Sequence, residues 1–208
     1  MNQEIYEVLA QRIVTLQYKP GQIINLKAVA SEFHVSTTPV REALLCLTQQ
    51  HLVTAKPYVG MCASNIDLKS IRDAYELKIT LEGLASRLVA RQGNVSVAER
   101  LNALLKTMEQ IPPDHSAQFN DLDEQCHALI REACGNEQLC ETLENLHMQT
   151  LRFRNFINFD APDRENCLTT FHQIANAIIN ADEQSAEEAA KRHTSTFFNH
   201  LLQRFFAL

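Results

Sequence analysis

The stretch VSTTPVREALL at residues 35–45 constrains the fold most strongly. Ser36 can cap a helix, and Pro39 loses no hydrogen bond in a first turn, because the first N–H groups of a helix have no partner within it. The stretch therefore predicts a helix over residues 37–50 that begins at a tip of small hydroxyl residues. A short amphipathic segment, residues 26–33, ends just before this tip. Together the two segments predict a helix-turn-helix.

The segments around this pair complete the pattern of a winged helix. Residues 2–17 place apolar side chains on one helical face and end at KPGQ, where Pro and Gly stop a helix. QIINL is a short β-branched segment that predicts a small strand, and residues 52–64 predict a hairpin with Gly60 available for its turn. We therefore predict a winged helix-turn-helix domain over residues 1–65.

This arrangement suggests DNA binding, because the second helix of a helix-turn-helix enters the major groove with its N-terminus first. Ser36, Thr37 and Thr38 can donate hydrogen bonds to phosphate oxygens there. Arg41 lies one turn further along and can reach a guanine edge or a phosphate. The alternative is an ordinary capped surface helix in which Arg41 pairs with a nearby acid.

The charge distribution divides the chain into two modules. The net charge is −6, but residues 1–66 hold five Lys and Arg against four Asp and Glu, and the rest holds 14 against 21. Only the first module is therefore suited to phosphate. The six cysteines form no CxxC pair, there is no long apolar run, and the N-terminal segment carries acids. We expect a cytoplasmic protein with reduced thiols.

The segment PGQIINLKAVASEFHVSTTPVREALLCLTQQHLV, residues 20–53, resembles the winged helix-turn-helix of the GntR family. The resemblance implies DNA contacts on the first helix of the motif, on the recognition helix and in the wing. They fall at Lys27, Ser36, Thr38, Arg41, Lys56 and Gly60. Three departures bear on which half-site is read: Thr37 stands in place of Arg, His34 in place of Gly, and KPYVG in place of an Asn-Arg-Gly wing tip.

After residue 66 the pattern is purely helical and predicts an antiparallel helical bundle. Six helices are expected, at residues 67–92, 96–110, 114–134, 137–158, 164–180 and 183–206. The segments at residues 74–90, 123–136 and 174–193 resemble the FCD effector domain of FadR-like regulators, in its six-helix, VanR-like form. The resemblance implies an effector-binding and dimerisation domain over residues 67–208.

A metal site is the chemistry to test in this domain. Asp123 and His127 are four residues apart, so both project from one helical face and can share an ion; the alternative is a solvated or helix-pairing histidine. The FCD resemblance adds His193 as a ligand and puts Phe171 where a further histidine usually stands. Either His172 replaces that ligand, or an oxygen of water or effector does, or the site is lost. Zinc is the metal expected.

Positive side chains suggest the class of effector. Lys78, His147 and Arg152 could line a pocket for an anion such as an organic acid, or they could be ordinary surface charges. The overall prediction is a homodimeric regulator that binds a pseudo-palindromic operator and responds to a small molecule. The alternatives are a metal-dependent helical enzyme and a DNA-binding dimer without an effector. We expect no enzyme, because neither a catalytic triad nor a nucleotide-binding glycine loop is visible.

Overall fold

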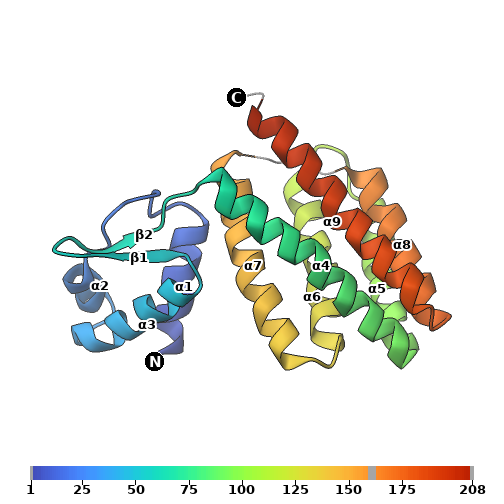
Figure 1. The fold of residues 1–208 in the computed structure, drawn as a ribbon, viewed down its shortest axis with the longest axis horizontal. Helices are drawn as coiled ribbons and strands as arrows, with labels where there is room; N and C mark the ends of the chain where they lie inside the picture. The colour runs from blue at the N-terminus through green and yellow to red at the C-terminus, as the bar shows by residue number, and fades with distance from the viewer. Residues whose placement is uncertain (1, 159–162, 207–208) are drawn as a thin grey trace. The chain divides into compact units, whose positions relative to one another are not determined.

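The computed structural model describes residues 2–158 and 163–206, so most of the predicted DAPD link at residues 160–163 lies outside it. The chain forms two compact units. Unit 1 contains residues 1–72 and 147–158, and unit 2 contains residues 73–146 and 159–208. The described part of the chain is mostly α-helical with one small sheet, which confirms the predicted fold class (Figure 1).

Unit 1 contains the predicted winged helix. Its elements are α1 (Gln3–Val14), α2 (Leu26–Glu32), α3 (Thr37–Gln49), β1 (Val53–Lys56) and β2 (Gly60–Ala63). The side chain of Asn25 accepts hydrogen bonds from the first N–H groups of α2, which explains where that helix begins. The two strands pair antiparallel, with Val53 opposite Ala63. The small strand predicted at QIINL is reduced to a single bridge between Ile23 and Cys62.

The core of unit 1 lies between its helices and the hairpin. Ile5, Leu9 and Ile13 of α1 are fully buried, as is Leu44 of α3. In each helix the buried apolar residues lie on one face, and this periodicity is the pattern from which the sequence predicts both helices.

The end of α7 also belongs to unit 1. Met148 and Leu151 pack against the core of the winged helix. Arg152 Nη2 donates to the carbonyl oxygen of Ser64 at 2.7 Å, and Asn155 Nδ2 donates to the carbonyl oxygen of Val14 at 2.9 Å. Residues 147–158 are therefore a structural part of the N-terminal unit, a role that the sequence did not indicate.

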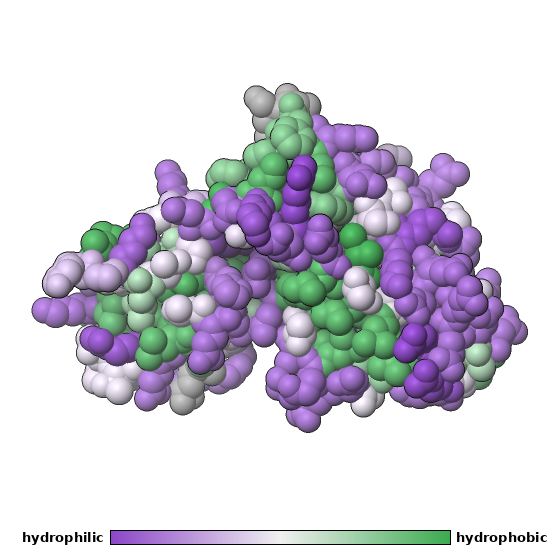
Figure 2. Space-filling model, viewed as in Figure 1, coloured by the Kyte–Doolittle hydropathy of each residue, from purple (hydrophilic) through white to green (hydrophobic). Residues whose placement is uncertain are grey.

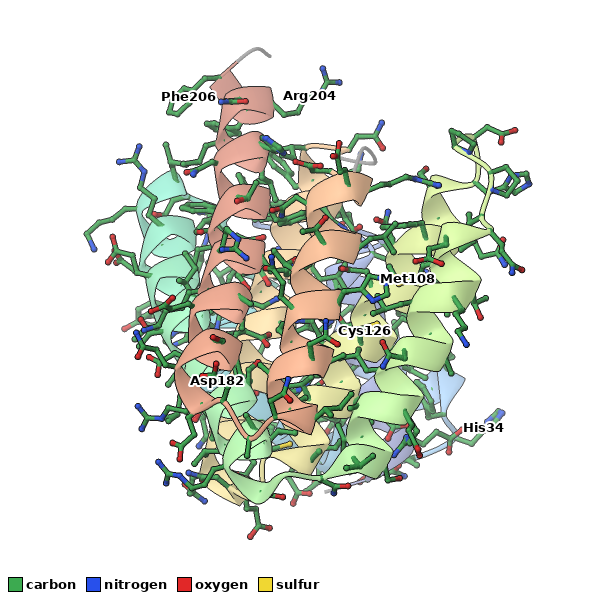
Figure 3. The ribbon with its side chains drawn as sticks, turned by 90° about the vertical axis from the view of Figure 1, so that its right-hand side faces the viewer. His34, Met108, Cys126, Asp182, Arg204 and Phe206 are labelled. Atoms are coloured by element: carbon green, nitrogen blue, oxygen red, sulfur yellow. The ribbon has the colours of Figure 1, made fainter. Side chains whose placement is uncertain are left out.

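Unit 2 is a helical bundle in which α8 lies alongside α9, as Figures 1 and 3 both show. The six predicted helices are confirmed to within a few residues. They are α4 (Leu68–Gln92), α5 (Val95–Glu109), α6 (Ser116–Ala133), α7 (Glu137–Phe156), α8 (Arg164–Ile179) and α9 (Glu183–Phe206). Among the residues that the structure describes, no helix is long and apolar enough to cross a lipid bilayer.

The core of unit 2 combines apolar packing with a buried polar cluster. Leu101, Leu105, Phe119 and Ile178 are fully buried between the helices. Buried polar side chains on α4, α6, α8 and α9 lie in the same interior. Because a buried polar group costs stability unless it is partnered, these side chains are the natural place to look for a binding site.

Candidate nucleic-acid interface and metal centre

The side chains predicted to contact DNA are all on the surface. The exposed residues are Lys27, Ser36, Thr37, Thr38, Arg41, Lys56 and Gly60. Ser36 occupies the predicted N-cap position of α3, but its side chain makes no capping hydrogen bond. The N-terminus of α3 therefore presents hydroxyl groups and backbone N–H groups together, an arrangement that suits phosphate.

Two turns of the winged helix use unusual backbone conformations. His34 has a φ of 54°, in the left-handed region that glycine adopts most readily. The turn before α3 therefore keeps a glycine-like geometry although its residue is histidine. In the wing, Tyr58 has a φ of 62° and its side chain is fully exposed, and Gly60 has a φ of 115°. Tyr58 is a candidate contact that the sequence analysis missed, although its place at the middle of the hairpin turn was a signal for it.

In unit 2 the structure brings together the three predicted metal ligands. Asp123 and His127 project from α6 and His193 from α9, and one ligand atom from each lies within 4.8 Å of the others. The two imidazole Nε2 atoms are 3.1 Å apart. Asp123 Oδ1 lies 3.6 Å from His193 Nε2, and Asp123 Oδ2 lies 3.9 Å from His127 Nε2. Both histidines are buried.

The other nitrogen of each imidazole is held by a neighbouring helix. His193 Nδ1 is hydrogen-bonded to Thr170 Oγ1 of α8 at 2.9 Å, whereas His127 Nδ1 lies 3.3 Å from Glu82 Oε2 of α4 as an ion-pair contact without hydrogen-bond geometry. Such contacts fix the orientation of an imidazole and leave Nε2 to bind a metal. Glu82 was missed by the sequence analysis, and its only signal was a position one turn after Lys78 on the same face of α4.

The surroundings of the two histidines shift their pKa values in opposite directions. Burial disfavours the charge on His127, but the adjacent Glu82 outweighs it and raises the pKa of His127. Burial lowers the pKa of His193 to about 4, and the charge of Asp123 only partly opposes this. For Glu82, burial would raise the pKa, but His127, Lys78 and Arg131 together lower it to about 2. Without an ion, a proton therefore favours His127 over His193, and His127 Nε2 is placed to donate to His193 Nε2.

Phe171 and His172 are adjacent on α8, but their side chains point to different surroundings. The ring of Phe171 packs against both imidazoles, with centroids 4.4 Å from His193 and 5.3 Å from His127. His172 turns away, and its Nε2 lies 3.0 Å from Glu109 Oε1 on the surface. The suggestion that His172 replaces the missing ligand is therefore not supported, because one residue along a helix is a rotation of about 100°.

The predicted effector residues fall into separate parts of the molecule. Lys78 is buried on α4, and its charge acts on Glu82 and His127. Arg152 is buried in unit 1, where it donates to Ser64, and His147 belongs to the same segment of unit 1. Of these three residues, only Lys78 is thus in unit 2 with the predicted metal ligands.

Arg131 is a buried cation that the sequence analysis missed. It lies one turn after His127 on α6, and its Nη2 pairs with Glu124 at 3.3 Å and with Glu144 at 3.0 Å. Its Nη1 has no hydrogen-bond partner among the described residues, and the same holds for Glu82 Oε1. Unpartnered buried polar atoms of this kind would be stabilised by a hydrogen bond from water or a ligand.

Two families of known proteins match the chain. The FCD domain family matches residues 73–196, and the family described as bacterial regulatory proteins, gntR family, matches residues 1–62. The chain belongs to the GntR family and carries an FCD domain.

Relatives along almost the whole chain are transcriptional regulators. The chain is 27% identical over 202 residues to the uncharacterized regulator YdhC of Bacillus subtilis, covering 95% of this chain and 87% of YdhC. It is 27% identical over 195 residues to the repressor RspR of Escherichia coli, covering 93% and 85% of the two chains. These matches identify the chain as a DNA-binding transcriptional regulator with a C-terminal effector-binding domain.

Solved structures agree with this fold. The chain matches E. coli McbR/YncC with a TM-score of 0.79 at 19% identity, covering 97% of each chain. It matches a GntR regulator from Rhodococcus sp. RHA1 with a TM-score of 0.71 at 15% identity, covering 99% of this chain and 97% of the other. At these identities the likeness supports the architecture.

Proposed function

We propose that this regulator binds its operator as a homodimer and that a divalent ion, held by Asp123, His127 and His193, controls the response to an anionic effector. The observation that carries the proposal is the pair of buried Nε2 atoms 3.1 Å apart beside a carboxylate. Two imidazoles and a carboxylate form a ligand set that suits zinc, with a carboxylate beside the second nitrogen of His127 and a hydroxyl hydrogen-bonded to that of His193.

The charges around the ligands support a bound cation. Glu82, Asp123 and Glu124 contribute three carboxyl groups, whereas Lys78 and Arg131 contribute two basic groups. Against the effect of burial, the adjacent Glu82 raises the pKa of His127, which supports an environment that favours a further positive charge. A divalent ion would supply that charge in place of the proton on His127.

The same charges support an anionic effector. An anion alone would meet a cluster rich in carboxylates, whereas a bound ion would present a positive centre with coordination positions left for a carboxylate oxygen. Lys78 and the unpartnered Nη1 of Arg131 could then hold the far end of the anion. We therefore propose a small organic acid as the effector, with Lys78 and Arg131 in its site in preference to His147 and Arg152.

A leucine stripe on α4 supports dimerisation through unit 2. Leu77 is exposed, and Leu81, Leu84 and Leu88 are half-buried, a spacing that lines up one helical face. Figure 2 shows hydrophobic side chains gathered where Figure 1 labels α4 and α6. A homodimer would carry two copies of α3, which fits a pseudo-palindromic operator, and we place the protein in the cytoplasm with its DNA.

Elemental analysis tests the metal proposal. Full-length protein, purified without a histidine tag or chelator, should contain about one zinc per chain, and His127→Ala should lose it. His172→Ala is the matched control, because that imidazole faces Glu109 and should not affect metal content. Both variants should still bind operator DNA, since the recognition helix is in unit 1. Wild-type protein that stays metal-free after addition of zinc would overturn the proposal.

Carboxylic acids can then be screened for the effector. A panel of small mono-, di- and tricarboxylic acids should include one that raises the melting temperature of the zinc-loaded protein and changes its affinity for operator DNA. Removing the zinc with chelator should abolish both effects. The same effects in chelator-treated protein would mean that the anion is bound by side chains alone.

A further inference from the structure

Cys167 lies beside the proposed metal centre. It is not one of the three predicted ligands Asp123, His127 and His193. This cysteine is on α8, one turn before Phe171 and on the same helical face. It is 4% exposed, and its Sγ lies 3.1 Å from Asp123 Oδ1, donating a hydrogen bond to that oxygen. A sulfur atom therefore touches the carboxylate that is proposed to bind the ion.

We propose that the thiolate of Cys167 is the fourth protein ligand of the ion, completing a site of one carboxylate, two imidazoles and one sulfur. This inference rests on the proposed function, because it concerns the same ion. Tetrahedral zinc with bonds of about 2.0 Å to oxygen and 2.3 Å to sulfur brings those two ligand atoms to roughly 3.5 Å from each other. The observed 3.1 Å is close to this separation.

Binding would require Cys167 to lose its thiol proton and to turn its side chain. In the structure its thiol proton points to Asp123, and Cys167 is not among the residues whose ligand atoms all lie within 4.8 Å of one another. When an ion binds, that proton leaves to solvent and the sulfur turns from the carboxylate oxygen towards the ion. His127 also gives up its Nε2 proton to solvent, so that both imidazoles can bind through Nε2, and no oxidant or reductant is needed.

The geometry around the other ligands favours this position for the sulfur. Asp123 and the two histidines approach from α6 and α9, and Thr170 holds His193 from α8. Phe171 fills the α8 side with an apolar ring that cannot coordinate an ion. Cys167, one turn earlier, is then the ligating side chain that α8 offers next to Asp123.

A sulfur ligand has consequences for metal choice and for the effector. Thiolate favours zinc and other soft or borderline ions over magnesium, calcium and manganese, which prefer oxygen. With four protein ligands in place, an effector oxygen would bind as a fifth, an expansion that zinc allows.

Cobalt provides a direct test, because a thiolate bound to Co²⁺ gives an intense near-ultraviolet charge-transfer band that imidazole and carboxylate do not give. Co²⁺ added to metal-free full-length protein should produce this band at one equivalent. Cys167→Ala should remove the band and weaken zinc binding by about 100-fold or more, as expected for loss of a ligand.

Cys126→Ala is the matched control. Cys126 is also a buried thiol, next to His127 in the sequence, but its Sγ faces Met108 Sδ at 3.9 Å, and the two side chains are labelled in Figure 3. This variant should keep the band and bind zinc within about threefold of wild type. Loss of the band in Cys126→Ala, with the band kept in Cys167→Ala, would overturn the assignment.

The wild-type protein alone decides the question if Cys167→Ala does not fold. X-ray absorption at the zinc edge should then show one sulfur neighbour at about 2.3 Å. Zinc bound with only nitrogen and oxygen neighbours would overturn the role of Cys167 and leave the proposed metal centre standing. Failure of the wild-type protein to bind zinc or cobalt at all would overturn the metal centre itself, and the role of Cys167 with it.

Discussion

Arg152 Nη2 donates a hydrogen bond to the backbone carbonyl oxygen of Ser64 across 2.7 Å. The donor is at the end of α7, and the acceptor directly follows the wing of the DNA-binding unit. Burial lowers the pKa of Arg152 to about 10, so its guanidinium is still charged at neutral pH. A buried guanidinium that donates to a backbone carbonyl therefore links the segment 147–158 to the winged helix.

The first prediction is that the winged helix depends on this segment. A fragment of residues 1–72 should be less stable than the same fragment joined to residues 147–158 by a flexible linker. The difference should be about 2–4 kcal/mol in free energy of unfolding, from two hydrogen bonds and the contacts of Met148 and Leu151 with the core. Urea unfolding measures it. In the linked fragment, Arg152→Ala with Asn155→Ala should remove the hydrogen-bond part, and equal stability of all three fragments would contradict the prediction.

The second prediction separates two kinds of DNA contact. Arg41→Ala should weaken binding to the operator by about 1–3 kcal/mol with little effect on non-specific DNA, if the guanidinium reads a guanine edge. Lys27→Ala should weaken binding to both DNAs alike and reduce the salt dependence, as expected for a phosphate contact. Both side chains are exposed, so neither change should affect folding. Fluorescence anisotropy at several salt concentrations distinguishes the outcomes, and an identical profile for the two variants would refute the assignment.

The third prediction concerns the pH dependence of stability without metal. The pKa of Glu82 falls from 4.5 to about 2 on folding, so its contribution is complete above pH 4.5 and is lost as the pH falls towards 2. The pKa of His127 is raised above 6.5, so its contribution is complete below pH 6.5 and is lost as the pH rises through the folded value. The pair should therefore stabilise the protein most between pH 4.5 and 6.5.

Urea unfolding of wild type and Glu82→Gln in the presence of chelator tests this dependence. The stability difference should be larger at pH 6.0 than at pH 8.5. Glu109→Gln is the control, because Glu109 pairs with His172 on the surface and should change stability by less than about 0.5 kcal/mol at either pH. A Glu82 effect that stays constant or grows towards pH 8.5 would show that the two groups are not coupled in this way.

Short-range sequence patterns were enough to predict the order and type of the helices. The helix that begins after Ser36 and the six helices of the second half are encoded by apolar periodicity and by Pro, Gly and Asn at their ends, which are short-range signals. The pairing of Asp123 with His127 is likewise a short-range relation along one helix. These features could therefore be predicted before any tertiary contact was known.

The remainder of the metal centre depends on contacts that sequence spacing does not encode. Thr170 meets His193 across 23 residues, and Cys167 meets Asp123 across 44. Neither residue carries a local signal, because Thr and Cys are common in helix interiors without binding anything. The same is true of Arg152, whose hydrogen-bond partner Ser64 is 88 residues away in the sequence.

The final prediction tests whether Thr170 orients His193 for metal binding. Thr170→Val keeps the shape of the side chain but removes the hydroxyl that lies 2.9 Å from His193 Nδ1, so zinc affinity should fall about 10- to 100-fold. Thr194→Val is the matched control, because the hydroxyl of Thr194 is buried without a hydrogen-bond partner among the described residues.

Only Thr170→Val should change zinc affinity. Thr194→Val should bind zinc like wild type and be equally stable or more stable by about 1 kcal/mol, since it removes an unsatisfied buried group. Thr170→Val should lose affinity while its helical content, followed by circular dichroism, is unchanged. Competition with a zinc chelator of known affinity measures both. Equal zinc affinity in the two variants would mean that His193 is held in place by packing against Phe171 and not by the hydroxyl of Thr170.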